Sequence, residues 1–452
     1  MNTKKQTATQ HLFTNKQLRT LLVPIMVEQL LSSLMGTADT MMVSNVGSAA
    51  ISAVSLVDAI NILVIQALSA LAAGGAILCS QYLGSQNLKK AKRSAEQVLF
   101  VMLVLSCSLS LLCLIFRFPL LRLIFGTVDT DVMANSQIYF FFTLLSFPFI
   151  GLYDAGASIL RAQNNTKGPM TISILSNFLN IGGNAILIFV FGMGVAGAAI
   201  STLVSRIFCA IVVIWQLRNP AEQIYVRNYF SIRPDWSLIK RVLFIGIPSG
   251  IENSMFQFGK LAIQSTVSTL GTVAIAAQAM TSILEALNGI AAMGVGIGLM
   301  TVVGQCIGAK RKDEAIYYIK RLSWLSEIVI LISCAVVYLL AKPVTILGGM
   351  EAESARLCLQ MVAFITITKP ISWVLSFIPA YGMRAAGDVK FSMITSCITM
   401  WTFRFCLCVY LIRVCGMGPM AVWIGMFTDW TVRAIVFGLR FKSGKWMEHK
   451  VV

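Results

Sequence analysis

Apolar runs of about 20 residues recur along the whole chain, separated by short polar or charged segments. A helix needs about 20 apolar residues to cross the hydrocarbon core of a bilayer, whereas a barrel strand needs only about 9–11. The runs are too long and too continuous for strands, so they predict an all-α integral membrane protein. We expect twelve transmembrane helices, at residues 20–42, 52–76, 94–116, 134–160, 169–191, 195–217, 242–264, 273–300, 318–341, 357–382, 391–412 and 418–439.

The composition supports this prediction. Of the 452 residues, 57% are hydrophobic and only 12% are charged, whereas a soluble domain carries about 25% charged residues. A soluble chain of this length would need a charged surface that this chain lacks. The first 19 residues are basic and polar, and they lead into the first span without a small-residue cleavage site, so we expect no signal peptide.

The net charge of +17 is informative through its placement along the chain. Most of the 36 Lys and Arg lie in the two tails and in every second loop, with clusters at 89–93, 227–241 and 310–312. Basic residues concentrate in cytoplasmic loops. We therefore expect a multi-pass protein of the cell inner membrane, with both termini cytoplasmic. We expect the protein to lie in a lipid bilayer and not to bind nucleic acid.

The second half of the chain repeats the first half. The stretch SQYLGSQNLKKA at 80–91 aligns with GQCIGAKRKDEA at 304–315, an offset of 224 residues. Other matched pairs follow in order: Pro24 with Pro248, Glu28 with Glu252, and, at an offset of 223, Arg161-Ala162 with Arg384-Ala385. Six spans per half is an even number, so both halves enter the membrane from the same side. Parallel repeats of this kind are typical of secondary transporters, which bind substrate at the interface between the halves.

The repeat predicts five segments. A cytoplasmic tail at 1–19 precedes an N-terminal six-helix bundle at 20–217. A cytoplasmic linker at 218–241 leads to a C-terminal six-helix bundle at 242–440, and a second cytoplasmic tail follows at 441–452. We expect the two bundles to face each other across a cleft.

Several stretches resemble one family of transporters. They are PIMVEQLLSSLMGTADTMMVSNVGSAAISAVS, SQYLGSQNLKKA, LRAQNNTKGP and FGMGVAGAA in the first half, and MRAAGDVK and CGMGPMAVW in the second. Over nearly its whole length the chain resembles the MATE (multidrug and toxic compound extrusion) transporters of the MOP flippase superfamily. The resemblance implies an antiporter that exports drugs or toxic organic compounds in exchange for Na+ or H+. It implies alternating access, no other cofactor and no enzymatic activity.

Asp39, in the outer half of the first span, is the main candidate for cation or proton coupling. The resemblance implies that this carboxylate takes up a proton or serves as a Na+ ligand, and oxygen suits a hard cation. Asn180 and Asn184 lie one turn apart on the fifth span, where the resemblance implies an Asn followed four residues later by an Asp. This chain has Asn184 at the position of that Asp, so the second carboxylate is absent. Asp39 could instead be a structural cap, and the two Asn could be interhelical hydrogen-bond donors.

The second half offers further ionisable residues inside spans, where charges are costly and often functional. Glu285 lies near the middle of the eighth span, and Lys260 on the seventh span could pair with it. Glu252 is the repeat mate of Glu28, which favours a shared structural role over coupling. Four more residues are candidates for cleft-lining or structural charges: Arg206, Arg404, Asp429 and Arg433. The last two are four apart and can pair along their helix.

The charges well inside spans are nearly balanced. Six acids (Asp39, Asp58, Asp154, Glu252, Glu285 and Asp429) oppose five bases (Arg206, Lys260, Lys369, Arg404 and Arg433). We therefore expect small organic, amphipathic substrates that are not restricted to cations. The alternatives are a flippase for a lipid-linked precursor, from the same superfamily, and an integral-membrane enzyme. The enzyme would need a catalytic cluster that the sequence does not show, and no pattern indicates an oligomeric state.

Overall fold

The computed structural model describes residues 11–126, 129–229 and 232–449. Within these ranges the chain forms helices and no strands, as the periodicity predicts. Six long helices or helix pairs in each half account for the twelve expected spans. The fold is therefore an all-α membrane protein built from two six-helix bundles.

The first half forms one bundle, which we call the N-lobe. Its helices are α1 (Asn15–Ser44), α2 (Ser48–Gly84), α3 (Leu88–Ile115), α4 (Arg117–Phe125), α5 (Thr130–Ala162), α6 (Lys167–Asn184) and α7 (Gly194–Leu217). A π-helical segment, η1 (Ala185–Val190), extends α6 to the length of a full span. The short helix α4, between the third and fourth spans, was not predicted. It is too short to cross a bilayer.

The second half forms the C-lobe. Its helices are α8 (Trp236–Val267), α9 (Thr272–Gly308), α10 (Lys312–Leu347), α11 (Ala352–Ala385), α12 (Val389–Thr399), α13 (Leu407–Arg413) and α14 (Met420–Ser443). The π-helical η4 (Met400–Cys406) joins α12 and α13 into one span, and two single 3-10 turns, η3 (Ser268–Leu270) and η5 (Lys445–Met447), complete the lobe. Helix α8 begins inside the expected linker, because the Asp235 side chain accepts hydrogen bonds from the amides of Ser237 and Leu238 and caps the helix.

Ten of the described helices are long and apolar enough to cross a membrane by composition alone. Helices α1 and α8 are not among them, although they are 30 and 32 residues long. They are the first span of each repeat, and both carry ionisable residues, including Asp39 on α1 and Lys260 on α8. These two helices occupy equivalent places in the two lobes.

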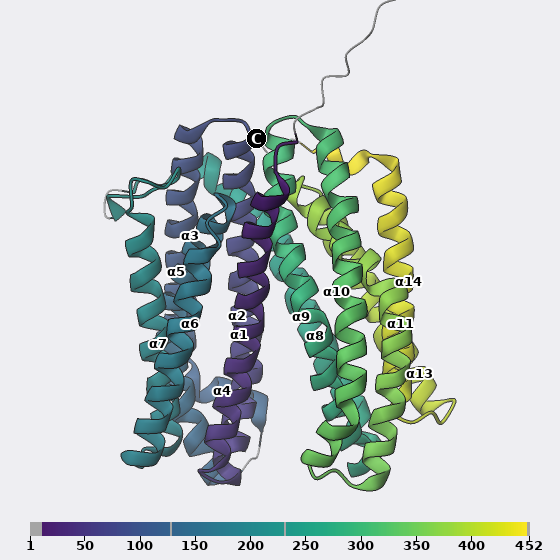
Figure 1. Cartoon of the computed structure of the whole chain (residues 1–452). Helices are drawn as coiled ribbons and strands as arrows, with labels where there is room; N and C mark the ends of the chain where they lie inside the picture. The colour runs from purple at the N-terminus through teal and green to yellow at the C-terminus, as the bar shows by residue number, and fades with distance from the viewer. Residues whose placement is uncertain (1–10, 127–128, 230–231, 450–452) are drawn as a thin grey trace, which may run out of the picture.

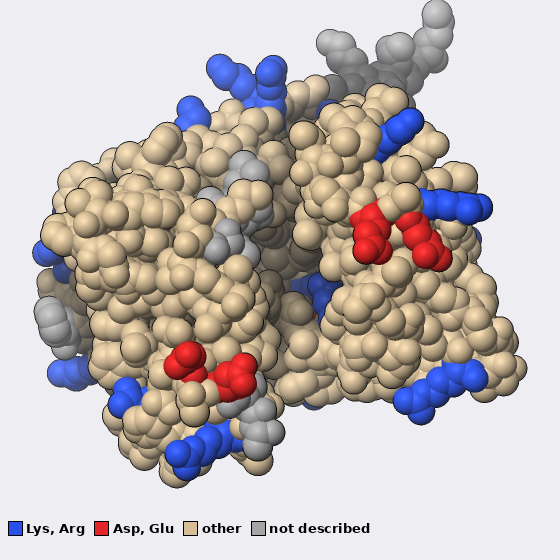
Figure 2. All heavy atoms as spheres, turned by 90° about the horizontal axis from the view of Figure 1, so that it is seen from below, with Lys and Arg blue, Asp and Glu red and all other residues tan. Residues whose placement is uncertain are grey.

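The lobes stand side by side, with the start of α1 and the end of α14 at the same end of the molecule (Figure 1). They touch where α2 packs on α8 and α9, and where α1 packs on α9. Seen from the opposite end, the surface is hollowed between the lobes (Figure 2). We call the end that carries the termini the closed end, and the space at the other end the hollow.

The repeated stretches noted in the sequence meet at the closed end. Gln81 Nε2 of α2 donates a hydrogen bond to the Ala385 carbonyl of α11 (2.7 Å), and Gln305 Nε2 of α9 donates to the Ala162 carbonyl of α5 (2.8 Å). Each bond joins one lobe to the other. The two lobes therefore close on each other through matching contacts from matching positions.

Two glycines allow this close approach. A Cβ on Gly84 would overlap the backbone of Gln305, and a Cβ on Gly308 would overlap the backbone of Gln81. The absence of side chains at these two positions lets α2 and α9 cross in contact, each backbone against the other.

The segment before α1 also joins the lobes. The Tyr318 hydroxyl of α10 bonds both the amide and the carbonyl of Phe13 (3.0 and 2.9 Å), and Glu314 accepts a bond from the amide of Leu12 (2.8 Å). The start of the N-lobe's first helix is thus held by the C-lobe.

Candidate cation and substrate sites

Asp39, Asn180 and Asn184, the three coupling candidates of the first half, come together in the structure. Asn184 Nδ2 lies 2.5 Å from Asp39 Oδ1 and 3.4 Å from Asn180 Oδ1. Asp39 is partly exposed, whereas both asparagines are fully buried. The cluster therefore joins α1 to α6 and has its carboxylate on the accessible side.

Helix α7 holds Asn180 in place. The Asn180 amide donates to Thr202 Oγ1 (3.3 Å), and Ser201 Oγ donates to the Asn180 carbonyl (2.8 Å). Asn184 is the last α-helical residue before the π-helical η1, and π-helical turns are frequent at functional sites. The sequence alone gave no indication of this change in helical geometry.

One buried oxygen of the cluster has no hydrogen-bond partner. Within the described ranges, Asn184 Oδ1 is inaccessible to solvent and meets no donor. Such a group is costly to bury. Together with the Asp39 carboxylate and Asn180 Oδ1, it provides oxygen atoms of the kind that a hard cation prefers. In the part of the chain that the structure describes, no group of three or more His, Cys, Asp or Glu is arranged to hold a metal ion.

The interior of the N-lobe carries an excess of acidic groups around Asp39. Asp58 accepts hydrogen bonds from Tyr139 (3.2 Å) and Asn61 (3.1 Å). Arg206 bonds Ser146 Oγ (2.6 Å), and its guanidinium interacts electrostatically with Asp39 and Asp58. The positive charge of Arg206 therefore lies near two negatively charged carboxylates and cannot neutralise both. Asp154, which accepts a bond from Ser69, adds a third acid to this lobe.

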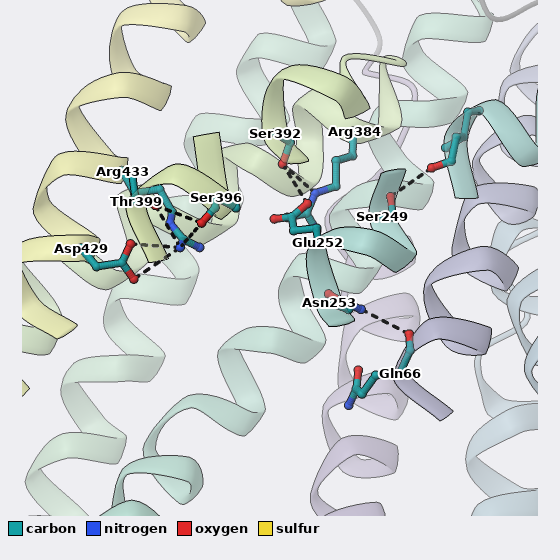
Figure 3. A network of polar contacts seen from close by, with 11 residues as sticks. Gln66, Ser249, Glu252, Asn253, Arg384, Ser392, Ser396, Thr399, Asp429 and Arg433 are labelled. Atoms are coloured by element: carbon teal, nitrogen blue, oxygen red, sulfur yellow. Dashed lines mark hydrogen bonds and ion pairs between the residues drawn. The ribbon is translucent and has the colours of Figure 1, made fainter. Parts of the chain in front are cut away.

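Glu252 forms the same kind of ion pair as its repeat mate. Glu28 Oε1 lies 2.6 Å from Arg161 Nη2, and Glu252 Oε1 lies 2.7 Å from Arg384 Nη2. Both glutamates are buried. Figure 3 shows the second pair, with Ser392 on the same guanidinium. The repeat aligns Arg161 with Arg384 and Glu28 with Glu252, and this alignment could have indicated equivalent ion pairs. The sequence did not show that the Arg and the Glu of each half face each other.

Glu285 pairs with Lys369 and not with Lys260, which corrects the expected pairing. Lys369 Nζ lies 2.6 Å from Glu285 Oε1 and donates a second bond to the Glu285 carbonyl (2.9 Å). Lys260 interacts with Glu285 only electrostatically, at longer range. The reason is packing, because α11 lies against α9 and places fully buried Lys369 beside the acid.

Asp429 and Arg433 pair along α14, as their spacing predicts. Arg433 Nη2 lies 3.1 Å from Asp429 Oδ1, and the same nitrogen reaches Thr399 Oγ1 (3.3 Å) on α12 (Figure 3). Arg404, on η4, lies 3.9 Å from the same carboxylate. Two arginines therefore share one aspartate inside the C-lobe.

The duplicated six-helix bundles, with charged pairs buried inside each lobe, define a multi-pass membrane transporter. The MatE family profile matches residues 24–186 and again 248–410, together more than half of the chain. The chain belongs to the MatE family, the multidrug and toxic compound extrusion transporters.

Individual relatives agree over the full length. A probable multidrug resistance protein NorM from Thermotoga maritima is 26% identical, over 97% of this chain and 94% of that protein. Among solved structures, a MATE transporter from Vibrio cholerae matches with a TM-score of 0.88 at 19% identity, covering 96% of this chain and 98% of that one. A MOP superfamily transporter from Pyrococcus furiosus matches with a TM-score of 0.86 at 20% identity, covering 96% and 97%. At these identities the structural matches establish the fold.

Proposed function

We propose that the protein exports small organic compounds from the cell by antiport with Na+ or H+, and that Asp39 takes up the coupling ion. One observation carries the proposal. A partly exposed carboxylate on α1 is bonded to Asn184, whose buried Oδ1 has no partner in the described structure. The family match supports the class of cargo and does not favour the flippase alternative.

The contact between Asp39 and Asn184 suggests how an ion would act. In the structure the carboxylate accepts the Asn184 amide and so holds α1 against α6. A proton would neutralise Asp39 and weaken this charge-assisted bond. Na+ would instead draw Asp39 and the Asn184 carbonyl oxygen around itself, which requires the amide to turn. Either ion changes how α1 is attached to the N-lobe.

The hollow and the placement of the basic residues support an outward-facing state in the proposed cycle. We assign the closed end to the cytoplasm of a cell with this protein in its inner membrane, because the basic residues at 89–93, at the start of α3, and at 310–312, before and at the start of α10, lie there. The structure is then outward-facing. An ion entering through the hollow reaches Asp39, organic cargo leaves, and the lobes rock to open the cytoplasmic end.

The test is dye efflux from liposomes that contain the purified protein, under an imposed Na+ gradient and then an imposed pH gradient. We expect one gradient to drive efflux in the wild type and Asp39→Asn to abolish it. Asp131→Asn, at an exposed acid at the start of α5, is the matched control and should transport normally. Efflux by Asp39→Asn at the wild-type rate would remove Asp39 from the mechanism. Failure of every dye under both gradients would contradict drug antiport.

A further inference from the structure

The C-lobe encloses more positive than negative charge. Its interior cluster, which we call the basic cluster, contains Lys260, Lys369, Arg404 and Arg433, with only two acids among them, Glu285 and Asp429. Glu252 and Arg384 neutralise each other separately. The basic cluster therefore has two bases that no acid fully balances, whereas the N-lobe interior is acidic.

The unbalanced bases are Lys260 and Arg404. Lys369 and Arg433 take the closest ion pairs, at 2.6 and 3.1 Å. Arg404 Nε is 3.9 Å from its nearest carboxylate oxygen, and no described residue accepts a hydrogen bond from it, although only 2% of the side chain is exposed. Arg404 Nη1 donates to the Met400 sulfur (3.5 Å), a weak acceptor, and a buried guanidinium so poorly paired is costly. An anionic ligand would satisfy it.

An aromatic ring lies at the centre of the basic cluster. The Phe256 ring centroid is 4.9 Å from Arg404 Cζ, 5.2 Å from Lys260 Nζ and 6.0 Å from Arg433 Cζ. Three cations therefore surround one ring. Trp373 and Phe377, whose tilted rings have centroids 5.0 Å apart, add aromatic surface beside Lys369 and Arg433. Such an arrangement can contact the planar part of a ligand through the rings and its charge through the cations.

Lys260 is the accessible member of the basic cluster. Lys260 is exposed and forms no ion pair among the described residues, and it lies on α8, which packs against α2 of the N-lobe. Figure 2 shows Lys or Arg atoms on the C-lobe side of the hollow. A ligand reaching the basic cluster would therefore meet exposed Lys260 before half-buried Phe256 and buried Arg404.

We infer that the basic cluster is a binding subsite for the acidic group of an aromatic substrate, a carboxylate or phosphate, held by Lys260 and Arg404 beside Phe256. The inference rests on the proposed export of organic compounds and names their chemical class. The two lobes then divide the charges between them: the coupling ion binds at the acidic N-lobe and the anionic part of the cargo at the basic C-lobe.

Two dyes with the same xanthene ring system test the subsite by binding alone. We would measure fluorescence anisotropy of anionic carboxyfluorescein and of a cationic rhodamine ester with the purified full-length protein in detergent. We expect carboxyfluorescein to bind more tightly, and Lys260→Gln to weaken its binding about tenfold. Lys260→Arg should restore it. Lys342→Gln, at an exposed lysine on α10 outside the basic cluster, should have no effect.

Arg404→Gln provides a second variant, with thermal unfolding as the check that the protein is folded. We expect it to weaken carboxyfluorescein binding and to leave rhodamine binding unchanged. Equal carboxyfluorescein affinity in the wild type and Lys260→Gln, or a wild-type preference for the rhodamine ester, would overturn the inference. Because no ion gradient is applied, this result is independent of whether antiport is confirmed.

Discussion

Gln81 and Gln305, at equivalent positions of the two repeats, each donate a hydrogen bond to the other lobe, at 2.7 and 2.8 Å. Their acceptors, the Ala385 and Ala162 carbonyls, also occupy equivalent positions, at the ends of α11 and α5. The same contact, made once by each repeat, therefore holds the closed end together. Opening of this end would have to break both bonds.

Removing both glutamine side chains should favour opening of the closed end. Each hydrogen bond contributes about 1 kcal/mol, so Gln81→Ala with Gln305→Ala should raise amide hydrogen exchange at the ends of α2 and α9 by about tenfold or more. Mass spectrometry of peptides from the ends of α2 and α9 measures this hydrogen exchange. Gln360→Ala, at an exposed glutamine on α11, is the control. Unchanged exchange in the double variant would show that the two bonds do not hold the lobes together.

A methyl group at Gly308 should push the lobes apart. Its Cβ would overlap the Gln81 backbone, which cannot move aside as a flexible side chain would. We expect Gly308→Ala to destabilise the closed state by about 1–3 kcal/mol, as overpacking does, and to lower the melting temperature. In Gly438→Ala the new Cβ meets nothing within 4 Å, so this variant should be neutral or slightly stabilised. Equal melting temperatures for the two variants would contradict the close packing.

Replacing Asn184 by Asp should strengthen Na+ binding. The new carboxylate would lie at the position now 2.5 Å from Asp39, and two adjacent carboxylates favour a bound cation. We expect NaCl to raise the melting temperature of Asn184→Asp more than that of the wild type, with choline chloride as the salt control. Asn184→Ala, which adds no charge, should show no such gain. A Na+ effect no larger than in the wild type would argue against a cation site between these two residues.

Breaking either buried ion pair should destabilise its own lobe. Glu28→Leu would leave Arg161 charged and unpaired, at a cost of about 3–5 kcal/mol, and Glu252→Leu would do the same to Arg384. Thermal unfolding followed by tryptophan fluorescence measures both changes.

Two further variants complete that comparison. Adding Arg161→Met to Glu28→Leu should recover most of the loss, because no unpaired charge remains. Arg93→Gln, which breaks an exposed pair with Asp235, should cost about 1 kcal/mol or less. If Glu28→Leu is no worse than Arg93→Gln, the buried pair contributes little to stability.

The spans and the repeat could be read from the sequence because both depend on local properties, namely the length of apolar runs and the offset between matched residues. The partner of Glu285 could not, since it depends on how α9 and α11 rotate against each other. The pairing of Lys369 with Glu285 is a result of that packing. The stretch at 80–91 was noted as repeated, but its sequence did not show that Gln81 reaches across to the other lobe.

The hydrogen bonds between Phe13 and Tyr318 connect α1 to the C-lobe, in addition to its contacts with its own lobe. One end of this helix is bound to α10 of the C-lobe, and Asp39 near its other end is bound to α6 of the N-lobe. A helix of 30 residues is about 45 Å long, so α1 spans the distance between its contact with the C-lobe at one end and its contact with α6 at the other, with the Glu28–Arg161 pair between them. The proposed ion uptake at Asp39 would weaken the contact with α6 while Phe13 stays bound to α10. A local change in charge at one end would then act on a helix that contacts both lobes and that carries Pro24 within it.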